Sequence, residues 1–74
     1  MNDKERIGKM IADIRTEQGL TVRELADLAG VASPNICKIE NGKYSPGVDV
    51  LSRILSAMSH RLTIEKLPDI PEKK

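Results

Sequence analysis

Few residues of this chain could carry out covalent chemistry. Cys37 is the only cysteine and His60 the only histidine among its 74 residues. Nucleophilic catalysis needs a nucleophile, a base and an orienting group that converge in one pocket, and two side chains in separate segments do not supply these. A single cysteine also excludes an internal disulfide and a multi-cysteine zinc site. We therefore expect a protein that is not an enzyme and that needs no cofactor or metal.

Length and composition indicate one small helical domain. A chain of this size buries only about 60% of its unfolded surface, so a partner chain would add stability that it needs. Tyr44 is the only aromatic residue, which leaves an aliphatic core of the kind that suits packed helices. The net charge is +1, so only a local basic face could favour nucleic acid. No apolar run approaches the roughly 20 residues that cross a bilayer, and we expect a cytoplasmic protein.

The spacing of apolar residues predicts four helices, over about residues 4–18, 21–30, 33–41 and 48–58. Asn2 with Glu5 and Thr21 with Glu24 have the spacing of capping boxes, whereas Ala32 leaves the third helix weakly capped unless Ser33 caps it. We expect Cys37 to be half-buried. The residues expected to face the core are Ile7, Met10, Ile11, Ile14, Val22, Leu25, Ala26, Leu28, Ala29, Ile36, Ile39, Val48, Leu51, Ile54, Leu55 and Met58.

The apolar period changes after Ser59. Leu62 and Ile64 alternate with Thr63 and Glu65, which predicts a strand over about residues 61–67. A lone strand in a helical chain needs an outside partner for its backbone, and a second copy would supply one in a homodimer. A fifth helix is the alternative, as is packing of the apolar pair on its own domain. The predicted domain covers residues 1–67, and the proline-containing, charged residues 68–74 are expected to form a flexible tail.

The segment from Leu20 to Gly42 is the most informative. It predicts two short helices joined by a tight turn at Gly30, with Ala26 small enough for the helices to cross closely. Ile36 and Ile39 would face inward and hold the third helix at a fixed crossing angle. Its N-terminal residues would then project outward, which is the arrangement that inserts a helix into the major groove of DNA.

At these residues the chain resembles the Cro/repressor (XRE) type of helix-turn-helix protein. The resemblance covers about residues 7–58, and its signature is Leu-Ala-x-x-Ala-Gly-Val from residue 25 followed by Ile-x-x-Ile-Glu-Asn-Gly from residue 36. It implies an all-α, lambda-repressor-like domain of four or five helices. It also implies a dimeric, sequence-specific transcriptional repressor of bacterial, phage or plasmid origin that binds operator DNA.

The resemblance also implies roles for particular residues. The base-reading positions fall on Ser33, Pro34, Asn35 and Lys38, of which Asn35 suits an adenine edge and Lys38 suits guanine or a phosphate. Ser33 and Asn35 could instead serve only as capping residues, and Lys38 as a solvated lysine. The phosphate-contacting positions fall on Asn41, Lys43 and Tyr44. The family's usual polar residue at the start of the second helix is Val22 here. Arg23 beside it could reach the DNA backbone in its place, or it could be only a solvated charge.

Two further expectations follow from the same resemblance. Arg15 and Glu40 match positions that form an ion pair in the fold interior, although each could also be an ordinary surface charge. The strand expected after the fourth helix is similar to that of the HipB-type antitoxins, in which the last strands pair across the dimer axis. In that layout Leu62, Thr63, Ile64 and Glu65 would form the dimer contact. This second resemblance implies an alternative function, binding of a HipA-like toxin protein as well as operator DNA.

Overall fold

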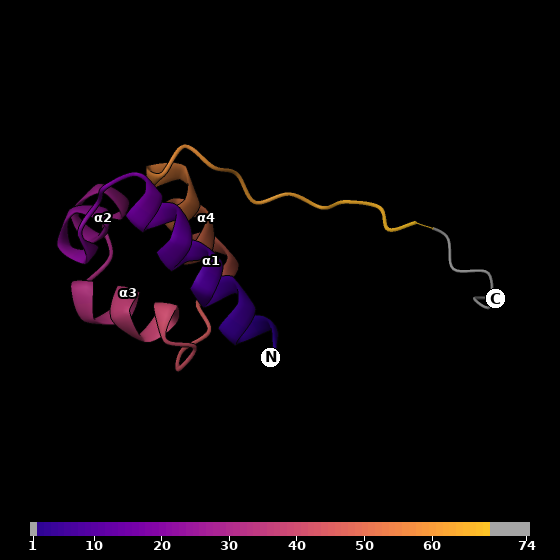
Figure 1. Ribbon diagram of the computed structural model, residues 1–74, viewed down its shortest axis with the longest axis horizontal. Helices are drawn as coiled ribbons and strands as arrows, with labels where there is room; N and C mark the ends of the chain where they lie inside the picture. The colour runs from indigo at the N-terminus through magenta and orange to yellow at the C-terminus, as the bar shows by residue number, and fades with distance from the viewer. Residues whose placement is uncertain (1, 69–74) are drawn as a thin grey trace.

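The computed structural model describes residues 2–68, and its described part is entirely helical apart from turns and coil (Figure 1). The helices are α1 (Asp3–Glu17), α2 (Val22–Ala29), α3 (Ser33–Glu40) and α4 (Val48–Ala57). The four helices predicted from apolar spacing are therefore confirmed. No described helix is long and apolar enough to cross a membrane.

The helix starts follow from local side chains. Asn2 accepts a 2.8 Å hydrogen bond from the Glu5 N–H, and the Glu5 side chain accepts one from the Asn2 N–H at 3.1 Å. Thr21 and Glu24 form the same reciprocal pair at the start of α2, at 3.0 and 2.8 Å. Both predicted capping boxes are present. In contrast, α3 begins after Ala32 with no side-chain cap, so its first turn depends on packing rather than on capping.

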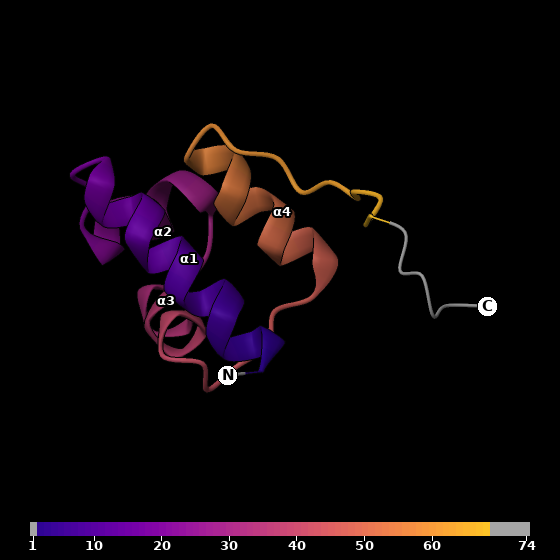
Figure 2. The ribbon, with the colours of Figure 1, turned by 45° about the vertical axis from the view of Figure 1, so that its right-hand side comes forward.

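The core lies where all four helices meet. Its fully buried large side chains are Ile11, Leu25, Ile36, Ile39, Ile54 and Met58. Figure 2 shows α1 crossing in front of the other helices, with α3 and α4 on its two sides. Because α2 and α3 have only eight residues each, neither is stable alone, and burial against α1 and α4 stabilises them.

Three residues predicted to face the core do not do so. Met10 is 48% exposed, Leu28 63% and Val48 69%. A short helix buries only a narrow stripe, and in α2 that stripe consists of Leu25, Ala26 and Ala29. The three exposed residues lie on the flanks of their stripes, where no neighbouring helix covers them.

Helices α1 and α3 approach each other closely at Gly8. A Cβ atom on this residue would collide with the carbonyl oxygen of Ile39 and lie 3.1 Å from that of Glu40. Gly8 is buried within α1, where glycine is otherwise unfavourable. Its missing side chain therefore permits near backbone contact between the two helices and sets the position of α3.

The prediction of a strand after α4 is wrong for this structure. Ser59, with φ of 61°, ends the helix, and the His60 N–H donates back to the Leu55 carbonyl at 2.8 Å. Residues 61–68 are neither strand nor the alternative fifth helix. Extended backbone becomes a strand only beside another extended segment, and the described chain offers none. The expected tail lies outside the described residues beyond Pro68.

Candidate nucleic-acid interface

The turn between α2 and α3 fixes how α3 is presented. Gly30 has a left-handed backbone (φ 70°, ψ 35°), and the Ala26 carbonyl accepts hydrogen bonds from the N–H groups of Gly30 and Val31, the latter at 3.0 Å. Only three residues then separate the helices. Ile36 and Ile39 are 0% and 1% exposed beneath α3. The opposite side of α3 consequently faces solvent.

The exposed side of α3 carries the predicted base-reading residues. Pro34, Asn35 and Lys38 are exposed, and Ser33 is half-buried at the first position of the helix. No side chain caps α3, so the alternative in which Ser33 caps it is wrong. Asn35 and Lys38 are three residues apart and therefore lie on one side of the helix. The structure thus brings these side chains to one solvent-facing surface.

The cations predicted to contact DNA are free of carboxylate partners. Arg23 on α2, Lys38 on α3 and Lys43 in the following loop are all exposed. Among residues 2–68 the salt bridges join residues of α1 to one another or α1 to Glu40, and none includes these three cations. Asn41 and Tyr44 are also exposed, beside Lys43. These side chains can therefore meet an anion without first breaking an internal ion pair.

The predicted ion pair between Arg15 and Glu40 is confirmed as a contact between α1 and the end of α3. The guanidinium donates to both carboxylate oxygens, from Nε to Oε2 at 2.7 Å and from Nη2 to Oε1 at 3.1 Å. Its Nη1 also donates to the Leu20 carbonyl at 2.8 Å. The side chains are only 15% and 9% exposed. One guanidinium therefore connects α1, the turn before α2 and α3.

This environment affects the ionisation of Arg15. The hydrogen bond to Glu40 raises the pKa of Arg15 above its already high ordinary value, desolvation opposes the rise, and the negative charge of Glu40 adds to it. Arg15 is consequently a permanent cation whose role is to hold α3 in place.

Two exposed residues near this surface were not among the predicted contact residues. Cys37 was expected to be half-buried but is exposed, between Ile36 and Lys38 on α3. Its spacing of three residues from Pro34 places it on the side of the helix that Pro34 occupies. Arg53 on α4 gave no such signal. Its Nη1 lies 4.0 Å from the point that a Cβ on Gly30 would occupy, so it reaches the α2–α3 turn from another helix.

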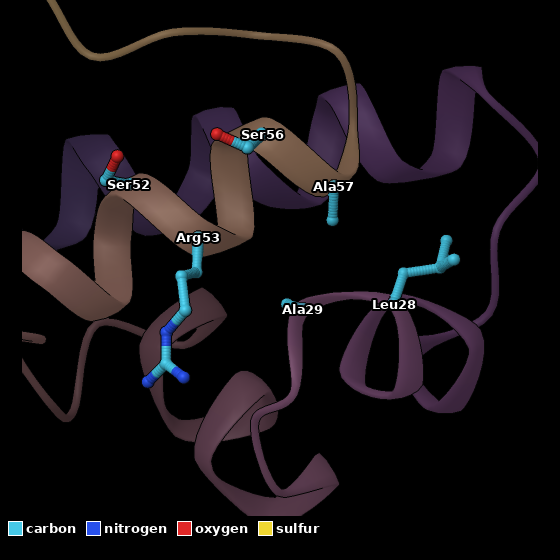
Figure 3. A pocket seen from close by; sticks show the side chains of 6 residues that line it. All are labelled: Leu28, Ala29, Ser52, Arg53, Ser56 and Ala57. Atoms are coloured by element: carbon cyan, nitrogen blue, oxygen red, sulfur yellow. The ribbon is translucent and has the colours of Figure 1, made fainter.

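Arg53 also borders a shallow hollow between α2 and α4 (Figure 3). Leu28 projects from α2 on one side, and Ser52, Ser56 and Ala57 line the α4 side. The hollow measures about 340 Å³ and is widely open to solvent. The polar residues that line it, Ser52, Arg53 and Ser56, are not buried. No cluster of His, Cys, Asp or Glu in the described part of the chain could hold a metal.

The predicted dimer-contact residues are not part of the α3 surface. Leu62, Thr63, Ile64 and Glu65 lie beyond α4, and all four are exposed. Figure 1 shows this segment leaving the helical body on the side opposite to α2. The structure therefore separates two surfaces, one on α3 with its following loop and one after α4.

A four-helix fold, with a second and third helix joined by a left-handed glycine turn and a third helix exposed along one side, defines the helix-turn-helix class of DNA-binding protein. The family described as Helix-turn-helix (HTH_3) matches residues 11–59, and the chain belongs to this family.

Similar proteins are regulators and control proteins. The ImmF control region 10 kDa protein of Bacillus phage phi105 is 34% identical over 70 residues, which cover 95% of this chain and 78% of that protein. The HTH-type transcriptional regulator PuuR of Escherichia coli is 35% identical over 66 residues, which cover 89% of this chain but only 35% of PuuR. The chain thus spans about a third of PuuR. Together with the family, these relatives make the chain a DNA-binding regulator of transcription.

Solved structures share the fold. The restriction-modification controller protein C.AhdI from Aeromonas hydrophila matches with a TM-score of 0.78 at 22% identity, covering 80% of this chain and 89% of that one. The clp gene regulator ClgR from C. glutamicum matches with a TM-score of 0.77 at 24% identity, covering 80% and 76%. At these identities the likeness concerns the fold alone.

Proposed function

We propose that this protein is a sequence-specific repressor that binds operator DNA as a homodimer, with α3 in the major groove. The observation that carries the proposal is the exposed side of α3, which presents Asn35 and Lys38 while buried isoleucines fix the opposite side. Asn35 pairs with an adenine edge, and Lys38 donates to guanine or to a phosphate. Pro34 and Ser33 complete the base-facing surface, with Pro34 suited to apolar contact with a thymine methyl group.

Phosphate contacts hold the helix in register. Arg23, Lys43, Asn41 and Tyr44 are exposed on either side of α3 in the sequence, and the two cations have no carboxylate partner among the described residues. Such contacts supply affinity without sequence preference. With Lys38 they amount to about three cations per protomer, which gives a slope of about −5 for log K against log salt concentration in a dimer.

Dimerisation sets the operator layout. A two-fold axis places two α3 helices in successive major grooves, so the half-sites are separated by one helical turn of about 34 Å. The exposed residues Leu62, Thr63, Ile64 and Glu65 supply the contact between protomers, without the strand pairing expected from the sequence. Repression then follows from occupation of a promoter, and a cytoplasmic location accords with this role.

The antitoxin alternative has lost the feature that suggested it. It depended on the similarity of a C-terminal strand to that of HipB-type proteins, and residues 61–68 form no strand. The named relatives reported above are regulators and control proteins. We therefore propose DNA binding alone.

The experiment is a titration of the protein against the DNA upstream of its own gene, at several salt concentrations, with a scrambled duplex of equal length as control. We expect tight binding to the upstream DNA and weak binding to the control. Equal affinity for both duplexes at every salt concentration would contradict sequence-specific autoregulation.

A further inference from the structure

A groove between α1 and α4 leaves apolar surface uncovered. It measures about 520 Å³ and is lined by Ile7, Met10 and Ile14 from α1 and by Leu51 and Leu55 from α4. Met10 keeps 48% of its surface exposed, whereas the adjacent Ile11 is 1% exposed. Water in contact with this much aliphatic surface is unfavourable, so a ligand or a chain that fills the groove would be stabilised by its burial.

The segment after α4 carries uncovered apolar side chains of its own. Leu62, Thr63 and Glu65 border the groove of their own chain. Ile64 is nevertheless 99% exposed and Leu67 73% exposed. The segment thus follows the edge of the groove without inserting its most apolar residues. A single chain leaves both sets of side chains in water.

The charges around the groove match those of the segment. Arg6 and Arg61 border the groove, and no acidic residue other than Glu65 is among the residues that line it. Glu65 is the one carboxylate between Leu62 and Leu67, and Lys66 follows it on the opposite side of the extended chain. A segment that enters the groove with Ile64 would therefore bring a carboxylate to the guanidinium group of Arg61, whereas Arg6 is already paired with Asp3 at 3.2 Å.

We propose that residues 62–67 of each protomer lie in the α1/α4 groove of a second copy, with Ile64 and Leu67 against the partner's Met10. A two-fold axis makes the exchange reciprocal, so one interface covers both grooves and both segments. The partner's Arg61 pairs with Glu65. This inference deepens the proposed repressor function, because the exchange forms the dimer that places the two α3 helices on the DNA.

Oligomeric state tests the exchange. In sedimentation equilibrium of the full chain we expect a dimer that dissociates on dilution. Ile64→Asp should weaken dimerisation at least about tenfold, because a carboxylate would replace a buried side chain twice in each dimer. Leu28→Asp is the matched control, an equally drastic change of an exposed leucine on α2 outside the groove, and it should leave the dimer unchanged. A wild-type monomer at every concentration, or equal effects of the two variants, would overturn the proposal.

Disulfide trapping distinguishes exchange from insertion into the same chain. In a Cys37→Ser background, one protein carries Met10→Cys and another Ile64→Cys. Mixing and oxidising the two should yield a mixed disulfide-linked dimer, identified by mass spectrometry. A control pair combines Leu28→Cys with Ile64→Cys and should yield none. If the double variant with both cysteines forms only an intramolecular disulfide and the mixture forms no dimer, the segment fills its own groove and the proposal fails.

The two proposals fail separately. Lys38→Ala should lose operator affinity and still form the trapped dimer. If the trapped dimer forms but wild-type protein does not discriminate operator from scrambled DNA, the repressor function is wrong and the exchange stands. If the operator is bound specifically and no trapped dimer forms, the exchange is wrong and the repressor function stands.

Discussion

The Arg15 guanidinium holds the Glu40 carboxylate through two hydrogen bonds, Nε to Oε2 at 2.7 Å and Nη2 to Oε1 at 3.1 Å. Glu40 is the last residue of α3, and Arg15 lies in the last turn of α1. Gly8 lies about two turns before Arg15 on the same side of α1, against the Ile39 carbonyl group near the same end of α3. An ion pair between α1 and α3 and a missing side chain on α1 thus help to orient the exposed helix, together with the Gly30 turn and the buried isoleucines of α3.

Removing one partner of this pair should destabilise the fold. Glu40→Ala would leave the Arg15 cation little exposed and without its carboxylate, and we expect a loss of about 3 kcal/mol in unfolding free energy. Lys9→Ala is the control, since it breaks an exposed pair within α1 whose side chains are 64% and 59% exposed, and should cost about 0.5 kcal/mol or less. Urea denaturation followed by circular dichroism measures both. Equal losses in unfolding free energy would show that the Arg15–Glu40 pair stabilises the fold no more than the exposed Lys9–Asp13 pair does.

The contribution of Arg15 should not vary with pH in the neutral and mildly alkaline range. Its folded-state pKa is raised by the hydrogen bond to Glu40. Stability from a raised pKa is fully present below the unfolded-state value and is lost only as pH rises through the folded value. Both values lie far above neutrality, so the difference in unfolding free energy between wild type and Glu40→Ala should be the same at about pH 7 and about pH 9. A difference that shrinks across this range would contradict the assignment.

Adding one methyl group at Gly8 should also destabilise the protein. Alanine is the better helix former by about 1 kcal/mol, but its Cβ would collide with the Ile39 carbonyl oxygen. We expect Gly8→Ala to cost about 2 kcal/mol in net terms. At Gly47, the N-cap of α4, a Cβ would have no neighbour within 4 Å, and Gly47→Ala should cost no more than about 1 kcal/mol, the loss expected from a poorer cap. Thermal unfolding of both variants decides the matter, and a stabilised Gly8→Ala would disprove the close approach.

Lys38 should matter for DNA affinity and not for folding. Lys38→Ala removes an exposed, unpaired cation from α3, and we expect operator binding to weaken by about 1–3 kcal/mol. Lys9→Ala removes a lysine that is already paired on α1 and should bind the operator as wild type does. Fluorescence anisotropy with a labelled duplex measures both affinities. An unchanged affinity for Lys38→Ala would mean that α3 is not the DNA-contacting helix.

Asn35 and Lys43 should affect different quantities. Asn35→Ala removes a base-edge contact, so the ratio of operator affinity to scrambled-DNA affinity should fall by about tenfold or more. Lys43→Ala removes a phosphate contact, so both affinities should fall together and the salt slope should become shallower by about 1 per protomer. Binding isotherms on the two duplexes separate the cases. A loss of discrimination in Lys43→Ala with none in Asn35→Ala would reverse the two roles.

Features encoded by neighbouring residues could be predicted from the sequence. The capping boxes at Asn2 and Thr21, and the left-handed turn at Gly30, depend on side chains within a few positions and occur where the sequence places them. The Arg15–Glu40 pair spans 25 positions and was expected only through family resemblance. The exposure of Asn35 and Lys38 followed from the buried positions of Ile36 and Ile39 on the same helix.

Features that depend on how separate helices meet could not be predicted in the same way. Met10, Leu28 and Cys37 have apolar or weakly polar side chains at plausible core spacing, and only the actual crossing of the helices leaves them exposed. Arg53 reaches Gly30 across 23 positions, which no local pattern reports. Apolar and polar residues alternate around Ile64, as is typical of a strand. A strand also needs a neighbouring extended segment for its backbone hydrogen bonds, and the local sequence does not show whether one is present.

The exposure of Cys37 has a practical consequence for work on this protein. It is the only thiol in the chain, it is solvent-accessible, and it precedes Lys38 directly on α3. A duplex that covers this helix should slow the reaction of the thiol with a maleimide, while a ligand bound elsewhere should leave the rate unchanged. Cys37 can therefore serve as a footprinting probe in the native chain. The fraction of Cys37 that escapes alkylation would report how much of α3 is occupied.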